Sequence, residues 1–146
     1  MIARNRENLV GSWRLESVSA LNEGGDRNNE PFGNGPKGSL TYTADGRMAV
    51  LISYGGRKPL SSEDRILAPA EEKNEAFSTF FAYSGRYSLL DDRVIHHVDI
   101  SSVENWVNTD LVRFIEFSDD RITLRTPPML SGGKNQTIEL VWERLI

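Results

Sequence analysis

The stretch GSLTYTADGRMAVLISY, residues 38–54, decides the fold, because it places a turn signal between two runs rich in aromatic and β-branched residues. The signal is Asp45-Gly46-Arg47. Asp and Gly accept the backbone angles of a tight hairpin, and Asp also hydrogen-bonds the backbone locally. The same format recurs at Asp91-Asp92-Arg93 and Asp119-Asp120-Arg121. We therefore expect three antiparallel hairpins, with strands paired as Gly38–Ala44 with Arg47–Tyr54, Tyr83–Leu90 with Arg93–Ser101, and Asp110–Phe117 with Arg121–Thr126.

Two further strands are expected at the ends of the chain, at Val10–Leu21 and Thr137–Leu145. Eight antiparallel strands joined by short turns predict an all-β fold, an up-and-down barrel whose closure removes exposed strand edges. The interior of such a barrel is wide enough for side chains or one small ligand. Because 146 residues is about the length of one domain, we expect a single domain over residues 1–146.

Composition excludes several classes of function. The net charge is −4, with 17 Lys and Arg scattered among 21 acids, so no basic surface for a nucleic-acid partner is expected. The polar start of the chain and the lack of a long apolar run predict neither export nor membrane insertion, and hence a cytoplasmic location. The absence of cysteine excludes disulfides, thiolate nucleophiles and Cys-ligated metals.

One segment departs from the β pattern. Pro69–Ala82 contains good helix formers, with acids in its first turn and Pro near its start, and predicts a helix between strands three and four. Phe77, Phe80 and Phe81 follow helical spacing, so one face of that helix should be buried. The helix either packs over the barrel or acts as a lid on its mouth. Residues 24–36 and 127–133 are expected to be loops.

The only two histidines are the neighbours His96 and His97. Side chains alternate between the faces of a strand, so the two rings diverge and no shared metal ion is expected. His96 lies on the more apolar face with Val94 and Val98, which predicts that it points inward. It is then either a hydrogen-bonded lining residue or a group that transfers protons.

The same alternation predicts which side chains line the interior. Arg113 either points inward, as the polar pole of a pocket, or lies on the solvent side while Val112 and Phe114 face the core. Trp106 follows the His96 strand in a loop and is either a rim cover or a ligand platform. The candidate ligand-binding residues are Tyr42, Met48, Tyr54, Tyr83, Tyr87, His96, Trp106 and Arg113, of which His96 is also the candidate catalytic residue.

Established catalytic signatures are absent from the sequence: it contains no nucleophile elbow, His-Glu-x-x-His motif, phosphate loop or calcium loop. The paired acids Asp91-Asp92 and Asp119-Asp120 fit turn chemistry better than acid–base catalysis. No cofactor and no metal are expected.

The two ends of the chain resemble the lipocalin pattern. Gly11-Ser12-Trp13 opens the first strand, and Trp142-Glu143-Arg144 closes the last. In lipocalins a Gly-x-Trp packs at the closed end of the barrel beneath an arginine from near the last strand, and the resemblance assigns that structural role to Gly11, Trp13 and Arg144. A guanidinium on an indole gives a cation–π contact worth about 0.5 to 2 kcal/mol.

Three internal stretches extend the likeness to nearly the whole chain. They are residues 38–48, 81–87, and His96-His97-Val98 with Asn105-Trp106-Val107. They are similar to a family of small bacterial and fungal lipocalin-like domains. The resemblance implies a lipocalin-like barrel fold and leaves the function open.

Three functions remain. The first is an intracellular barrel that binds a small, mostly apolar molecule oriented by His96 or Arg113. The second is a cofactor-free isomerase, cyclase or dehydratase with His96 as proton shuttle. The third is a filled barrel that serves as an interaction module. The expected partner is a small hydrophobic or amphipathic molecule, and a homodimer is the default oligomeric state.

Overall fold

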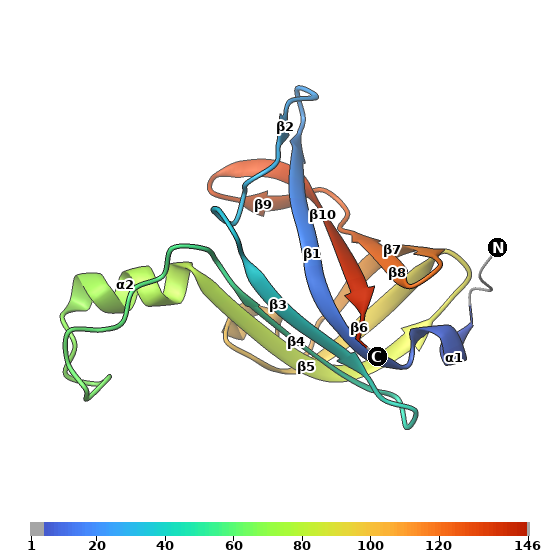
Figure 1. Cartoon of the computed structure of the whole chain (residues 1–146), viewed down its shortest axis with the longest axis horizontal. Helices are drawn as coiled ribbons and strands as arrows, with labels where there is room; N and C mark the ends of the chain where they lie inside the picture. Colours follow the sequence, from blue (N-terminus) through green and yellow to red (C-terminus); the bar gives the residue numbers. More distant parts are fainter. Residues whose placement is uncertain (1–4, 146) are drawn as a thin grey trace.

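The computed structural model describes residues 5–145, which form one ten-stranded antiparallel sheet closed on itself (Figure 1). Eight long strands make a barrel in the order β1-β3-β4-β5-β6-β7-β8-β10, and β10 returns to pair with β1. The elements are α1 (Arg6–Leu9), β1 (Gly11–Asn22), β2 (Arg27–Asn28), β3 (Lys37–Tyr42), β4 (Arg47–Ser53), α2 (Ala70–Ser78), β5 (Phe80–Leu89), β6 (Arg93–Ser101), the 3-10 helix η1 (Glu104–Trp106), β7 (Asp110–Ser118), β8 (Arg121–Arg125), β9 (Met129–Ser131) and β10 (Lys134–Arg144).

The three predicted hairpins are present as β3–β4, β5–β6 and β7–β8. In two of their turns a residue adopts the positive φ that such turns use: Gly46 at 94° and Asp119 at 50°. The predicted count of eight strands is correct for the barrel. It omits β2 and β9, two short strands inside the segments expected to be loops, which pair locally with β1 and β10.

The helix prediction was partly wrong. Helix α2 ends at Ser78, and Phe80 and Phe81 belong to β5, where they pair with Ser53 and Ile52 of β4. The pairing of β5 with β4 therefore outweighs the helical spacing of these phenylalanines. The helix also falls after β4, the fourth strand along the chain, and not between strands three and four. The short strand β2, which the prediction omitted, accounts for the difference.

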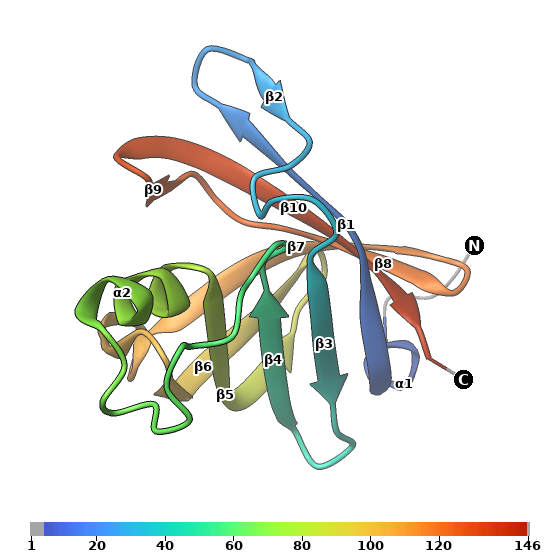
Figure 2. The same ribbon diagram turned by 60° about the vertical axis from the view of Figure 1, so that its left-hand side comes forward.

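Helix α2 does not bury an apolar face. None of its residues is buried, and Phe77 is 62% exposed. The helix stands beside one end of the barrel (Figure 2), where it contacts β5. It lines no part of the interior cavity described below, so this structure supports neither the expected apolar packing nor the lid interpretation.

The opposite end of the barrel is closed by α1 and the start of β1. Leu9 and Trp13 are fully buried there, and the indole N–H of Trp13 donates to the carbonyl of Leu9 at 3.0 Å. The guanidinium of Arg144 lies 4.2 Å from the centre of the Trp13 ring and donates to the carbonyls of Val10, at 2.8 Å, and Asn8. These contacts join both ends of the chain at the barrel floor.

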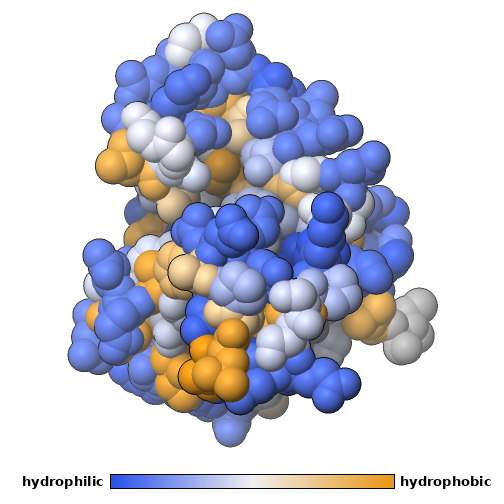
Figure 3. All heavy atoms as spheres, turned by 90° about the vertical axis from the view of Figure 1, so that its left-hand side faces the viewer, coloured by the Kyte–Doolittle hydropathy of each residue, from blue (hydrophilic) through white to orange (hydrophobic). Residues whose placement is uncertain are grey.

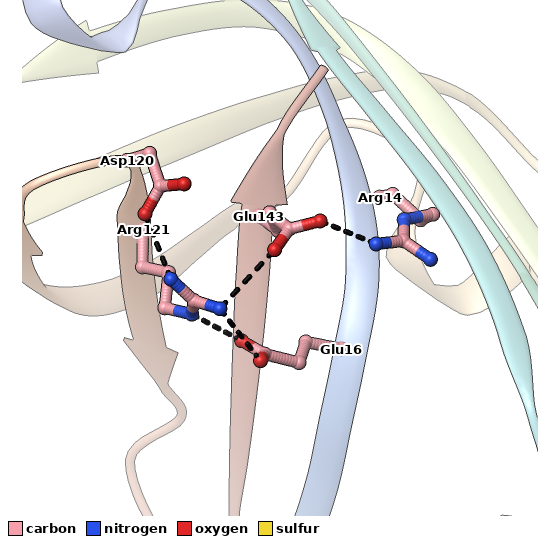
Figure 4. A network of polar contacts seen from close by, with 5 residues as sticks. All are labelled: Arg14, Glu16, Asp120, Arg121 and Glu143. Carbon is pink, nitrogen blue, oxygen red and sulfur yellow. Dashed lines mark hydrogen bonds and ion pairs between the residues drawn. The ribbon is translucent and has the colours of Figure 1, made fainter.

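An ion-pair network covers the seam where the sheet closes (Figure 4). Arg121 of β8 donates to Glu16 of β1 at 2.6 Å and to Glu143 of β10 at 3.1 Å, and Arg14 also pairs with Glu143. Glu16 lies where the β1–β10 register shifts between Leu15 and Ser17. Strand alternation points Glu16 outward with Arg14, and the bulge leaves Ser17 outward as well, so that Val18 is buried. The hydrogen bond from Arg121 lowers the pKa of the Glu16 carboxyl group.

Candidate ligand-binding cavity

The half of the barrel away from Trp13 contains a cavity of about 200 Å³. Figure 3 views the molecule from the α2 side and shows this face hollowed between an upper part that carries β2 and a lower part that carries α2, with apolar residues in the hollow. The cavity is lined mainly by apolar and aromatic side chains: Phe32, Leu40, Val50, Ile52, Tyr54, Phe81, Tyr83, His96, Trp106, Arg113, Leu124, Thr126, Met129, Leu130, Ser131, Ile138, Leu140 and Trp142.

A hydrogen-bonded chain of three side chains crosses the barrel interior. His96 of β6 is 1% exposed; its Nε2 lies 2.7 Å from the hydroxyl of Tyr42 on β3, and its Nδ1 lies 2.7 Å from the hydroxyl of Tyr83 on β5. Strand alternation explains the placement, because Val94, His96 and Val98 are buried in succession. Both ring nitrogens of His96 are therefore occupied by tyrosine hydroxyls.

All three groups of this chain are neutral near pH 7. Burial lowers the pKa of His96 well below its usual value, and the charge of Arg113 acts in the same direction. Burial raises the pKa of Tyr42 well above that of an ordinary phenol. It also raises the pKa of Tyr83, although the charge of Arg113 opposes that shift.

The need to satisfy buried hydroxyls fixes the direction of the hydrogen bonds. Among residues 5–145, the hydroxyl of Tyr42 has His96 as its only hydrogen-bond partner and does not line the cavity, so we assign its proton to the hydrogen bond with Nε2. A neutral imidazole carries one proton, which then lies on Nδ1 and is donated to Tyr83. The hydroxyl proton of Tyr83 is left to point elsewhere, and Tyr83 lines the cavity.

Arg113 faces the cavity. It shares one face of β7 with Ile115, which is 2% exposed, so of the two predicted orientations the inward one is present. Its guanidinium donates to the carbonyl of Val112 at 2.9 Å and lies close enough to Tyr83 to act on the pKa of that phenol. No described acid forms a salt bridge with it, and Asp110, on the groove just outside, is paired with His97. Arg113 thus places a charge without a carboxylate partner at the edge of an apolar cavity.

Aromatic rings form one wall of the cavity. Phe32, from the segment before β3, stacks on Tyr54 with ring centres 4.5 Å apart. Trp106 of η1 contacts Phe81 and Tyr83 edge to face, at 5.6 and 5.9 Å. Flat rings in these orientations leave aromatic faces and edges available to an aromatic ligand.

A single buried polar atom on the lining residues lacks a partner. Trp142 of β10 is 1% exposed, and its Nε1 is the one buried side-chain nitrogen or oxygen in residues 5–145 that makes no hydrogen bond. Buried polar groups are usually paired, and an unpaired donor costs about 1 to 3 kcal/mol. A residue that lines the cavity therefore carries an unused donor.

Comparison with known proteins agrees with this architecture. The model of a family described as "Lipocalin-like domain" matches residues 10–145. The chain belongs to the lipocalin-like domain family. A 4'-hydroxy-3'-methoxypropiophenone carrier protein, ppsC, of Aspergillus oryzae is 34% identical over 107 residues, which cover 67% of this chain and 96% of the relative. A solved structure, EF1p2_mFAP2b bound to DFHBI, is 13% identical, covers 97% of this chain and 98% of its own, and superposes with a TM-score of 0.47.

Five of the predicted ligand-binding residues line the cavity of this lipocalin-like barrel: Tyr54, Tyr83, His96, Trp106 and Arg113. The other three do not. Tyr42 and Met48 are buried behind the lining, and Tyr87 lies toward the closed end, where its hydroxyl donates to the carbonyl of Thr43 at 2.8 Å. Inward orientation was thus predictable, but alternation gives no information on the height of a residue along the barrel axis.

Sequence reasoning missed Phe32, Phe81 and Trp142. Phe32 lies in a segment expected to be a plain loop, and no local pattern marks it as part of the lining. For Phe81 a signal existed, since the alternation of Tyr83, Gly85 and Tyr87 continues upstream to it. Trp142 was assigned only to the end-of-chain pattern.

His97 points away from the interior. Its Nδ1 lies 2.8 Å from a carboxylate oxygen of Asp110, and its Nε2 lies 2.9 Å from the hydroxyl of Ser88. The two histidines therefore contact different partners on opposite faces of β6. No cluster of three or more metal-binding side chains occurs within the described residues. No helix in the same range is long and apolar enough to cross a membrane.

Proposed function

We propose that this lipocalin-like protein binds and carries a small aromatic molecule in the barrel cavity. The observation that carries the proposal is an apolar, aromatic-walled cavity of about 200 Å³ with few polar side chains in its lining, among them Tyr83 and Arg113. An engineered protein cavity of about 150 Å³ holds benzene, so this volume suits one ring with short substituents. The cavity also argues against a filled barrel that acts only as an interaction module.

The relative from Aspergillus oryzae supports this size class, because 4'-hydroxy-3'-methoxypropiophenone is one aromatic ring with a hydroxyl, a methoxy and a short acyl substituent. We use that compound as the first probe. Purified protein is titrated with it while tryptophan fluorescence is followed, since Trp106 and Trp142 both line the cavity. Native mass spectrometry of the protein as purified tests in parallel for a retained molecule.

A matched pair of variants tests where the probe binds. Phe81 lines the cavity, whereas Phe77 is exposed on α2 and lies outside it. Phe81→Ala should weaken binding about tenfold or more, because it removes part of the aromatic wall, and Phe77→Ala should leave the affinity unchanged. Equal effects of both changes, or saturable binding with no effect of either, would place the ligand elsewhere.

Proton transfer by His96 would have to pass through Tyr83, because both of its ring nitrogens are already hydrogen-bonded to tyrosines. We therefore propose that His96 holds Tyr83 in place and does not react itself. His96→Gln tests this assignment: an enzyme would lose turnover of its substrate, whereas binding should weaken by only about 1 to 2 kcal/mol. A cytoplasmic location and a homodimeric state remain predictions.

A further inference from the structure

We propose that the cavity selects an acidic phenol and binds it as the phenolate, with the anionic oxygen held by Arg113 and Tyr83. This inference rests on the proposed function, and it adds the charge of the ligand and the residues that read it.

Charge balance is the first step. An arginine side chain stays protonated in proteins, and a cation beside apolar surface is costly unless an anion is nearby. Arg113 forms no salt bridge with any described acid, and the outer acid Asp110 already has His97 as its partner. Arg113 is partly buried and also lines the outer groove, so the positive charge at this end of the cavity has no carboxylate partner among the described residues.

The groups around Arg113 do not supply the missing negative charge. His96 and the two tyrosines of the hydrogen-bonded chain are fully or almost fully buried. Burial keeps the imidazole unprotonated and both phenols protonated, so each is neutral near pH 7. A ligand with an anionic oxygen would supply the negative charge that these groups lack.

Hydrogen-bond direction is the second, independent step. Tyr42 donates to His96 and His96 donates to Tyr83, so the hydroxyl proton of Tyr83 remains for the cavity. The hydroxyl proton of Tyr83 and the N–H groups of the Arg113 guanidinium are donors, which suits a ligand that presents oxygen acceptors. Charge-assisted hydrogen bonds to an anionic oxygen are about twice as strong as neutral ones.

An aromatic ring and an anionic oxygen combine in a phenol that ionises easily. The named ligand of the Aspergillus oryzae relative has this character, because its hydroxyl is para to a carbonyl group that withdraws electrons. The pKa of such a phenol lies below the value of about 10 for tyrosine. The phenolate then forms at a modest cost, which the positive charge of Arg113 offsets.

The test uses 4'-hydroxy-3'-methoxypropiophenone and its methyl ether, 3',4'-dimethoxypropiophenone, which cannot ionise. A phenolate absorbs at longer wavelength than its phenol, so the charge of the bound probe is read directly from its spectrum. The bound hydroxyl probe should show the phenolate band at a pH at which the free probe is neutral, with its pKa lowered by about one unit or more. The methyl ether should bind at least tenfold more weakly. Its affinity should stay constant over the pH range in which the hydroxyl probe ionises.

Arg113→Gln keeps a hydrogen-bond donor and removes the charge. This variant should lose the phenolate band, and its affinity for the hydroxyl probe should fall toward its affinity for the methyl ether. The control, Arg93→Gln, changes an outer arginine that contacts Phe114 and Asp92, and it should leave both measurements unchanged. Thermal unfolding checks that each variant is folded.

The outcomes separate the two proposals. Equal binding of both probes with no phenolate band overturns the charge inference and leaves the carrier function standing. Retention of the band in folded Arg113→Gln overturns the role of Arg113. Binding of neither probe overturns the proposed function for aryl ketones and, with it, the inference.

Discussion

The guanidinium of Arg144 lies 4.2 Å above the ring of Trp13, and the two residues face each other in the register that closes the barrel between β1 and β10. The same guanidinium donates to the carbonyls of Val10 and Asn8, so one side chain joins the last strand to α1 and to the first strand. The contact therefore unites residues more than 130 positions apart in the sequence.

Arg144→Ala should lower the free energy of unfolding by about 2 to 4 kcal/mol, because it removes the cation–π contact and leaves two carbonyls without their charged donor. Urea unfolding measures the change. Arg14→Ala is the control, since Arg14 is largely exposed and its ion pair with Glu143 should contribute little. A smaller loss for Arg144→Ala than for Arg14→Ala would contradict the proposed role in closure.

Gly11→Ala should be more harmful than replacement of a glycine in an open turn. Gly11 has φ of 138°, and a Cβ atom there would lie 2.7 Å from Nη1 of Arg144. Gly35 also has positive φ, but a Cβ there would meet nothing within 4 Å. We expect Gly35→Ala to cost about 1 kcal/mol and Gly11→Ala clearly more, as measured by urea unfolding. Similar costs would show that the contact with Arg144 adapts freely.

Much of this structure was predictable because a strand imposes a period of two on its side chains. That period separates His96 from His97, and the apolar residues Val94 and Val98 on the same face indicate that His96 points inward. The same period groups Arg113 with Ile115. The hairpins were predictable because the turn residues Asp and Gly carry a local conformational signal. Features that depend on sequence-local physics were therefore recovered.

The features that were missed depend on contacts between distant residues. Phe80 and Phe81 satisfy helical spacing, yet the pairing of β5 with β4 decides their conformation. Phe32 reaches the cavity from a segment with no regular pattern, and it is fixed by stacking on Tyr54. Neither the size of the cavity nor the lack of an acid beside Arg113 follows from spacing along the chain, because both depend on which strands meet across the barrel.

The stability of the barrel should depend on pH through His96. Burial lowers the pKa of His96 in the folded state, so below the unfolded-state pKa of about 6.5 the unfolded chain binds a proton that the folded chain does not. The stability therefore falls as the pH decreases from about 6.5 toward the folded-state pKa. The slope from this one group is at most about 1.4 kcal/mol per pH unit.

Urea unfolding of the wild type and of His96→Gln at about pH 7, 6 and 5 isolates this contribution. The variant cannot take up the proton, so its stability should decline less steeply over this range even if it is lower at pH 7. The carboxylates are common to both proteins and their effect cancels in the comparison. Parallel pH profiles would show that His96 does not titrate differently in the folded and unfolded states.

Tyr42 and Tyr83 each lie 2.7 Å from a ring nitrogen of His96, yet only Tyr83 lines the cavity. Tyr42→Phe and Tyr83→Phe should therefore each lower the stability, by about 1 to 3 kcal/mol, because each leaves a nitrogen of a buried imidazole without its partner.

The effects of these two changes on ligand binding should differ. Tyr83→Phe removes the protein hydroxyl that donates to the ligand, so it should weaken binding of 4'-hydroxy-3'-methoxypropiophenone about tenfold. Tyr42→Phe should change the affinity by less than about threefold. Isothermal titration calorimetry on both variants measures the difference. A larger loss of affinity in Tyr42→Phe would mean that the ligand depends on the hydrogen-bonded chain as a whole, and the assignment of Tyr83 as the direct contact would have to be abandoned.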